Sequence, residues 1–320
     1  MTTHTPARAE SRRSHPSAPP GSAERVRRRR LRRTAVCFLA PFTLLFVGVY
    51  LIPIGYTVDQ SLYRLHHDGL GLSAPTKAFA GFGNYVAAFH DAGFRASLLR
   101  VLLIGAVQVP LMLGLALALA LLLDARTTLF RSFFRLAYFL PYALPGVIGA
   151  LMWSYLVAPG LSPITALARD LGWSLDLTSN GMLAPTIGNM LTWGWTGYNM
   201  LIIYSALQAI PPELSEAATM DGCSPWRIAW HIKIPMVRPA LVLTAVFSII
   251  GTAQLYNEPA TLQAVAPNLS SDYTPIFAAY DSVANNNFPY AATESVILAV
   301  LAFVLSFGFL RLVQRRGVTR

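Results

Sequence analysis

Charged side chains are scarce in this 320-residue chain. Asp, Glu, Lys and Arg together make up 12% of it, and hydrophobic residues make up 54%. A soluble domain carries about 25% charged residues, so this chain cannot cover a water-soluble surface. The net charge of +10 does not indicate nucleic-acid binding, because ten of the 25 Lys and Arg residues precede Thr34 and abut the first long apolar run. The composition predicts a polytopic membrane protein.

Several catalytic and metal-binding patterns are also missing. The two cysteines, Cys37 and Cys223, are too few for a disulfide scaffold or a four-cysteine zinc site. The sequence contains no Gly-x-x-x-x-Gly-Lys-Ser/Thr phosphate loop, no His-Glu-x-x-His pattern and no nucleophile elbow. The histidines of the expected loops, such as His66 and His231, lack carboxylates at ligand spacing. We therefore expect no enzyme, no metal site and no cofactor bound by this chain itself.

Long uncharged runs, in contrast, are abundant. A bilayer core about 30 Å thick needs roughly 20 apolar helical residues for each crossing. Six runs meet that requirement and predict an all-α membrane protein with a transmembrane domain over 34–316. The predicted spans are 34–58, 101–123, 136–156, 183–207, 239–257 and 292–312. Glu294 lies near the start of the last span, and we expect its carboxylate at the headgroup level, where its cost is small.

Lys and Arg are shared unevenly between the connecting segments, and such residues concentrate on the cytoplasmic side. The two chain ends and the segments after spans two and four hold twenty of them, whereas the three alternate loops hold five. Both termini and the loop 208–238 are therefore predicted to be cytoplasmic. Residues 1–33, rich in Ser, Pro and Arg, are expected to be disordered. Their arginine cluster, 27–33, either contacts anionic membrane lipid or only sets the orientation.

The loop 208–238 carries the most specific local signals, which predict two short helices joined by a turn. Pro212 suits a first helical position, and Gly222 stands where a left-handed residue ends the first helix. Ser224 then caps a second helix that Pro235 ends. Two alanines on the exposed side of the first helix would let another backbone approach closely. These features are typical of a docking element.

The same loop resembles the signature of the inner-membrane permease subunits of binding-protein-dependent ABC importers. That signature reads Glu-Ala-Ala, three residues, Gly, nine residues and Ile-x-Leu-Pro. The matching residues are Glu216, Ala217, Ala218, Gly222, Ile232 and Pro235, with Ile234 in place of the Leu and Asp221 in the common Asp-Gly pair. The resemblance covers most of 34–316 and is strongest to the carbohydrate-uptake branch.

Further stretches carry the likeness to that branch, and two features depart from it. The similar stretches are 81–85 (Gly-Phe-Gly-Asn-Tyr), 139–153, 255–259, 271–275 and 286–292. Glu294 stands where the family is usually apolar, and the family's Gly-Gly-Pro after the fifth helix is missing. These departures affect the identity of the sugar rather than the docking loop.

The resemblance implies a sugar importer in which this chain is one half of the pathway. Its implied partners are a second related permease, a cytoplasmic ABC ATPase dimer that binds ATP and Mg, and an extracytoplasmic solute-binding protein. It also implies that the ATPase docks on the loop 208–238. The implied contact residues are Glu216, Ala217, Ala218, Asp221, Gly222, Ile232 and Pro235.

A sugar is held by planar hydrogen-bonding groups and aromatic faces inside an otherwise apolar cavity. Spans four and five offer such groups, which we expect to line the substrate pathway: Trp195, Tyr198, Asn199, Gln254, Tyr256 and Asn257. The first three are three and four residues apart and can share one helical surface. Trp193 and Trp195 fit interfacial anchoring equally well. Glu258 and Glu294 are expected on the outer surface, within reach of the binding protein.

A secondary transporter is the alternative reading of these spans. Such a protein usually needs acids or bases inside the membrane to carry a proton or an ion. Spans two to five contain no charged residue, so they provide no side chain that could carry a proton across the membrane. Dependence of transport on ATP and on a binding protein, and insensitivity to protonophores, separates the two.

Overall fold

The computed structural model describes residues 22–66, 75–125 and 127–317. The chain forms two compact units, residues 1–56 and residues 57–320. Helices make up nearly all the regular structure of the described residues, in agreement with the predicted all-α class, and the strands are confined to one short hairpin.

The first unit is built from one long helix. It comprises α1 (Ser22–Phe46), the π-helical turn η1 (Val47–Leu51) and the first residues of α2 (Ile52–Ser61), and it contains all but the last two residues of the predicted first span. Pro53 supplies no N–H to the α-helical ladder, and the wider turn before it accommodates that gap. Residues 1–21 of the segment predicted to be disordered lie outside the described residues. The remainder is helical from Ser22, because Arg, Ala and Glu extend an existing helix at little cost.

Three helical stretches of the described chain are long and apolar enough to cross a membrane. They are Arg29–Ser61, Ala92–Asp124 and Phe288–Arg315, and they contain the predicted spans one, two and six. The last two belong to α4 (Ala92–Asp124) and α15 (Phe288–Gly317), and α8 (Leu183–Gln208) covers the predicted fourth span. Two bent helix pairs would raise the number to five if each is one span. The count of six stays a prediction.

The predicted third span is a bent pair rather than one helix. It divides into α5 (Arg131–Ala143) and α6 (Gly146–Val157), which meet at 91°. Pro141 lies in the last turn of α5, and Pro145 forces Leu144 into an extended conformation with ψ of 139°. The residue before a proline is sterically disfavoured in the α region, so the helix cannot continue through this point.

The predicted fifth span is shorter than expected. Its helix α12 (Arg238–Ala253) is preceded, across a bend of 65°, by the helical segment Pro225–Met236. After Ala253 the chain turns so that Leu255 is buried, and the carbonyl of Leu255 accepts a 2.7 Å hydrogen bond from the Thr274 hydroxyl. A tertiary contact therefore ends this helix, and no sequence signal marked the position.

Short elements fill the segments that the predicted topology places outside the cell. These are β1 (Tyr63–His66), β2 (Thr76–Phe79), α3 (Gly83–His90), α7 (Pro163–Asp170), α13 (Asn257–Leu262) and α14 (Pro275–Ala284). The two strands pair antiparallel, with Tyr63 opposite Phe79. The buried amide of Asn84 donates to the carbonyls of Ser61 and Tyr63, at 3.3 and 2.5 Å. This asparagine of the Gly-Phe-Gly-Asn-Tyr stretch therefore holds α3 against the start of the hairpin.

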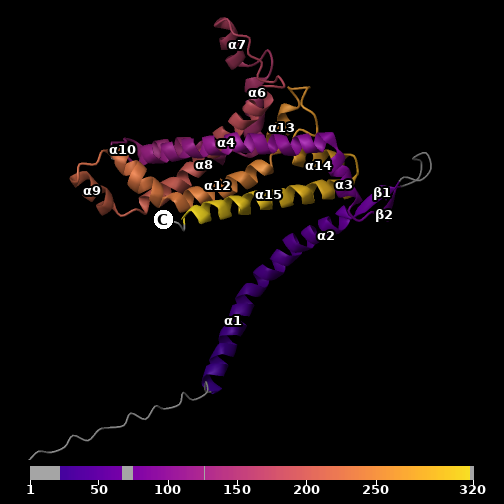
Figure 1. The fold of residues 1–320 in the computed structure, drawn as a ribbon, viewed down its shortest axis with the longest axis horizontal. Helices are drawn as coiled ribbons and strands as arrows, with labels where there is room; N and C mark the ends of the chain where they lie inside the picture. Colours follow the sequence, from indigo (N-terminus) through magenta and orange to yellow (C-terminus); the bar gives the residue numbers. More distant parts are fainter. Residues whose placement is uncertain (1–21, 67–74, 126, 318–320) are drawn as a thin grey trace, which may run out of the picture. The chain divides into compact units, whose positions relative to one another are not determined.

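One hydrophobic core cluster of the second unit lies between α4 and α8. Ala116, Ala120 and Leu123 of α4 pack against Met200 and Ile203 of α8. In Figure 1, α4, α8, α12 and α15 run side by side, with α9 and α10 at one end of this bundle and α3 and α14 at the other. The small residues of α4 bring the two backbones close, and the bundle buries its apolar side chains between the helices.

Candidate coupling segment and substrate pathway

The loop 208–238 forms a helix, a tight turn and a second helical segment. Its elements are α9 (Pro212–Met220), α10 (Pro225–Ile228), the π-helical turn η2 (Ala229–Lys233) and α11 (Ile234–Met236). We call 212–236 the coupling segment. Gly222 has φ of 77°, the left-handed conformation predicted for a residue that ends a helix. The Ser224 hydroxyl accepts from the Arg227 N–H at 3.4 Å, and the helix runs one residue past Pro235.

The predicted docking residues do not all lie on the surface of the coupling segment. Glu216, Ala217, Asp221 and Gly222 are exposed, and Ile232 and Pro235 are partly buried. Ala218 is buried, so the expectation that both alanines are exposed is wrong. The Ala218 carbonyl accepts from the Cys223 N–H at 2.9 Å as the turn folds back, which directs this residue toward the second helix.

The coupling segment also exposes large apolar side chains that the sequence interpretation did not include among the docking residues. Met220 is 88% exposed at the end of α9. Trp226 and Trp230 are exposed and stack on each other, with ring centroids 5.9 Å apart and planes 22° apart. Their spacing of one helical turn was visible in the sequence. Large exposed apolar groups in one short segment are typical of a protein contact surface.

An ion pair ties the coupling segment to the bundle. The Lys233 ammonium contacts the Asp124 carboxylate at the end of α4, and the Gln208 amide at the end of α8 donates to the same carboxylate at 2.7 Å. The two charged side chains are only 22% and 12% exposed. One carboxylate thus joins α4 to α8 and to the coupling segment, which lie more than eighty residues further along the chain.

We expect Asp124→Asn to destabilise the subunit by about 1–2 kcal/mol. Hydrogen bonds to charged groups contribute about 1.5–3 kcal/mol, and this pair is still partly open to solvent. Thermal unfolding of Asp124→Asn, Lys233→Gln and the double variant in detergent measures the effect as a double-mutant cycle. Additive losses from the two single variants would show that the pair is not coupled.

Trp195 and Tyr198, two of the predicted pathway residues, come together with a third aromatic residue. The Tyr142 ring of α5 stacks on Tyr198 at 4.5 Å and meets Trp195 edge to face at 5.3 Å. The approach of α5 to α8 depends on Gly197, whose α-hydrogen faces the Tyr138 backbone. The sequence interpretation missed Tyr142, because only the packing of α5 against α8 brings it to this position.

Asn199 faces the interior rather than the aromatic cluster. It is 1% exposed, and its amide donates to the Trp195 carbonyl at 3.1 Å and to the Ser248 hydroxyl of α12 at 3.4 Å. Nearby, the Thr252 hydroxyl of α12 donates to the Gln108 amide oxygen of α4 at 3.3 Å. These four polar side chains form a buried cluster between α4, α8 and α12, in which Gln108, Ser248 and Thr252 were not predicted. The Asn199 Oδ1 atom has no partner among the described residues.

The three candidates from the end of the fifth span are dispersed. Gln254 is exposed just after α12, whereas the Tyr256 ring contacts Phe277 and Tyr280 of α14. Asn257 lies near the start of α6, where a Cβ added at Gly146 would be 3.2 Å from its amide nitrogen. The predicted continuation of one helix through 257 would have aligned these side chains, but the end of α12 at Ala253 separates them.

The two carboxylates predicted at the outer surface are in fact largely buried. Glu294 is 3% exposed and accepts a 2.7 Å hydrogen bond from the Ser282 hydroxyl of α14. The expectation of an exposed headgroup-level position was wrong because α14 packs over the start of α15. Glu258 of α13 lines a cavity next to α6 and α8, and burial raises the pKa of its carboxyl above the usual value.

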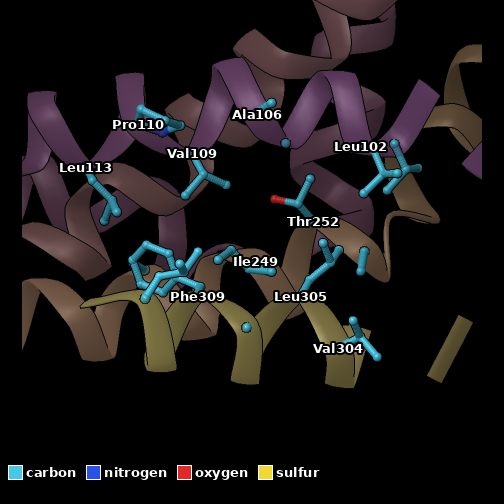
Figure 2. Close-up of a pocket in the computed structure, with 16 residues that line it drawn as sticks. Leu102, Ala106, Val109, Pro110, Leu113, Ile249, Thr252, Val304, Leu305 and Phe309 are labelled. Atoms are coloured by element: carbon cyan, nitrogen blue, oxygen red, sulfur yellow. The ribbon is translucent and has the colours of Figure 1, made fainter. Parts of the chain in front are cut away.

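A wide cavity of the second unit is unsuited to a polar solute. It has a volume of about 750 Å³ and lies between α4, α12 and α15. Figure 2 shows Leu102, Val109 and Leu113 of α4 facing Ile249 of α12 and Phe309 of α15. Among the described residues that line it, only Thr252 has a polar side chain, and its hydroxyl is already bonded to Gln108. A sugar would leave its hydroxyl groups unpaired in such a space.

Comparison with known proteins identifies the family of this chain. Residues 93–318 match the model of the binding-protein-dependent transport system inner membrane component family, which covers α4 to α15. The chain belongs to this family. It is a permease subunit of an ABC importer and a multi-pass membrane protein, and its relatives are transport components rather than enzymes.

Individual relatives match along most of this permease. The lactose transport system permease protein LacF of Rhizobium radiobacter is 31% identical over 84% of this chain and 90% of its own length. The trehalose transport system permease protein SugA of Mycobacterium tuberculosis is 29% identical over 88% and 89%. A solved bacterial ABC transporter involved in the import of the acidic polysaccharide alginate shares the fold, with a TM-score of 0.74, 17% identity, and coverage of 91% of this chain and 99% of that one.

Proposed function

We propose that this permease carries a sugar or oligosaccharide across the cytoplasmic membrane, driven by an ABC ATPase that docks on the coupling segment. The proposal that the ATPase docks here rests mainly on the exposure of Glu216, Ala217 and Asp221. The same segment also exposes the stacked rings of Trp226 and Trp230. The exposed carboxylates can form polar contacts with a groove on a partner protein, and the exposed apolar side chains can be buried in that groove. The ATP and Mg of the reaction are bound by that ATPase.

The ion pair at Asp124 supports a mechanical role for the coupling segment. Movement of the segment pulls on Lys233 and thereby on α4, while Gln208 carries the displacement to α8. Docking that differs between two states of the ATPase shifts a two-state membrane element, since a ligand moves an equilibrium by its differential affinity. The positive-inside distribution supports a cytoplasmic coupling segment and cytoplasmic termini.

The substrate pathway in this proposal runs along α8. Trp195, Tyr198 and Tyr142 supply aromatic faces, and the buried cluster around Asn199 supplies polar groups between α4, α8 and α12. A single chain with one coupling segment forms half of a pathway, so a second related permease completes it. An extracytoplasmic solute-binding protein delivers the solute. The names of two relatives, for lactose and trehalose transport, favour a disaccharide or related sugar.

Reconstitution of the importer in liposomes tests this proposal. The permease, its paired permease, the ATPase and the binding protein are assayed with radiolabelled lactose, trehalose and other disaccharides. We expect uptake that requires ATP and the binding protein and is unaffected by protonophores. Purified permease alone should move no solute. Uptake by this chain alone, or uptake abolished by a protonophore, would instead establish a secondary transporter.

The position of the coupling segment has a separate test. Met220 is highly exposed, so Met220→Cys in a background without Cys37 and Cys223 provides one accessible thiol. A membrane-impermeant maleimide should label it in inside-out vesicles but not in intact cells. Labelling from outside intact cells would overturn the proposed topology.

A further inference from the structure

A second cavity lies at the bend between α5 and α6, where α8 and α13 close it. Its volume is about 250 Å³. This is below the range of about 300–1,000 Å³ typical of pockets for drug-sized ligands, and it suits a single hexose-sized unit. The side chains that give it chemical character are Tyr142, Trp153, Trp193, Trp195 and Glu258.

Four of these side chains are aromatic and are held in two pairs. Trp153 of α6 and Trp193 of α8 meet edge to face at 5.9 Å, and Tyr142 meets Trp195 in the same way at 5.3 Å. Gly149 lets α6 approach closely, since a Cβ there would lie 3.5 Å from the Trp193 ring. Rigid aromatic side chains give a large contact area at low entropic cost, and a pyranose ring presents flat C–H faces that match them.

Glu258 is the one charged side chain among the described residues that line the cavity. The Glu258 carboxylate offers two acceptor oxygens, and no Lys, Arg or His is among the described residues that line the cavity. A sugar hydroxyl can donate to this carboxylate.

We propose that this cavity binds one uncharged hexose unit of the transported sugar and that Glu258 excludes anionic sugars from it. The inference rests on the proposed sugar transport and adds the charge class of the substrate. Donation from ligand hydroxyls to Glu258 favours neutral saccharides. A uronate or sugar phosphate would bring a second negative charge against a partly desolvated carboxylate, with no cation in the lining to offset it.

Two probes that differ only in charge test the proposal: methyl α-D-glucopyranoside and methyl α-D-glucopyranosiduronate. Their affinities are measured by saturation-transfer difference NMR on the assembled importer in nanodiscs without binding protein. We expect the wild type to bind the glucoside at least about tenfold more tightly than the glucuronide, because like charges in an interface are strongly unfavourable. Glu258→Gln, which keeps the shape, should bring that ratio close to one.

Trp153→Phe separates recognition from charge selection. It reduces the aromatic area of the lining, so we expect weaker binding of both probes with an unchanged ratio. Glu213→Gln, a matched change of an exposed carboxyl on α9, should alter neither affinity. Failure of the wild type to bind the glucoside, equal binding of the two probes by the wild type, or a ratio unaffected by Glu258→Gln would overturn the proposal. ATP-driven disaccharide uptake by the same preparation would show that only this inference, and not the transport function, had failed.

Discussion

Replacement of Gly197 by alanine is expected to prevent the permease from accumulating as a folded subunit. A Cβ at this position would overlap the Tyr138 carbonyl oxygen and would lie 2.6 Å from its carbon and 3.0 Å from Phe139 Cα. These are backbone atoms inside α5, so no side-chain rotation relieves the overlap. Ordinary overpacking costs about 1–3 kcal/mol, and we expect a loss above about 3 kcal/mol here.

The measurement is the amount of monodisperse protein after solubilisation and its thermal midpoint. Gly114→Ala is the matched control, because Gly114 is also inside a membrane helix but has nothing within 4 Å of the added Cβ. Alanine is a better helix former than glycine by about 0.8–1 kcal/mol, so this control should be neutral or stabilising. Equal thermal midpoints for the two variants would mean that α5 and α8 do not touch as described.

Disruption of the turn of the coupling segment is expected to abolish transport while leaving the subunit in the membrane. Gly222 combines φ of 77° with a 3.0 Å hydrogen bond from its N–H to the Thr219 carbonyl. Proline cannot adopt that φ and has no N–H, so Gly222→Pro reorients α9 relative to α10. We expect co-purification of the ATPase to fall at least about tenfold, which corresponds to about 1.4 kcal/mol.

A matched control separates docking from a general effect of proline. Gly172 has φ of 81°, and its N–H donates to the Arg169 carbonyl at 2.9 Å, so Gly172→Pro breaks the same local geometry after α7. That variant should retain the ATPase. Likewise Glu216→Lys should release the ATPase, whereas Glu213→Lys, an equal charge change on an exposed α9 residue, should have a smaller effect. Normal transport by both Gly222→Pro and Glu216→Lys would remove the coupling segment from the mechanism.

The local conformation of the coupling segment was predictable because short-range sterics determine it. Only glycine adopts a positive φ at little cost, and Ser224 caps a helix because its hydroxyl reaches the N–H three residues on. The burial of Ala218 was not predictable in this way. It depends on how the segment folds back on itself, which helical periodicity of α9 alone does not specify.

For the candidate pathway, too, the sequence predicted some residues, and only tertiary contacts placed the others. The aromatic content of the fourth span predicted Trp195 and Tyr198, yet Tyr142 joins them only because α5 packs against α8 at Gly197. Glu258 was expected on the outer surface, and it lines a cavity because α12 ends early and α13 turns back toward α6. One sequence cannot show these contacts, since they join residues more than fifty positions apart.

The sequence by itself determined the membrane class, the positions of the apolar helices and the turn of the coupling segment. Each of these follows from local chemistry: the transfer of apolar side chains into lipid and the allowed backbone angles of glycine and proline. Only the tertiary structure decided which polar groups are buried, where the third and fifth spans break, and which aromatic rings surround Glu258. Those outcomes depend on the close approach of helices, which requires small residues such as Gly149 and Gly197 to meet a particular neighbour in space.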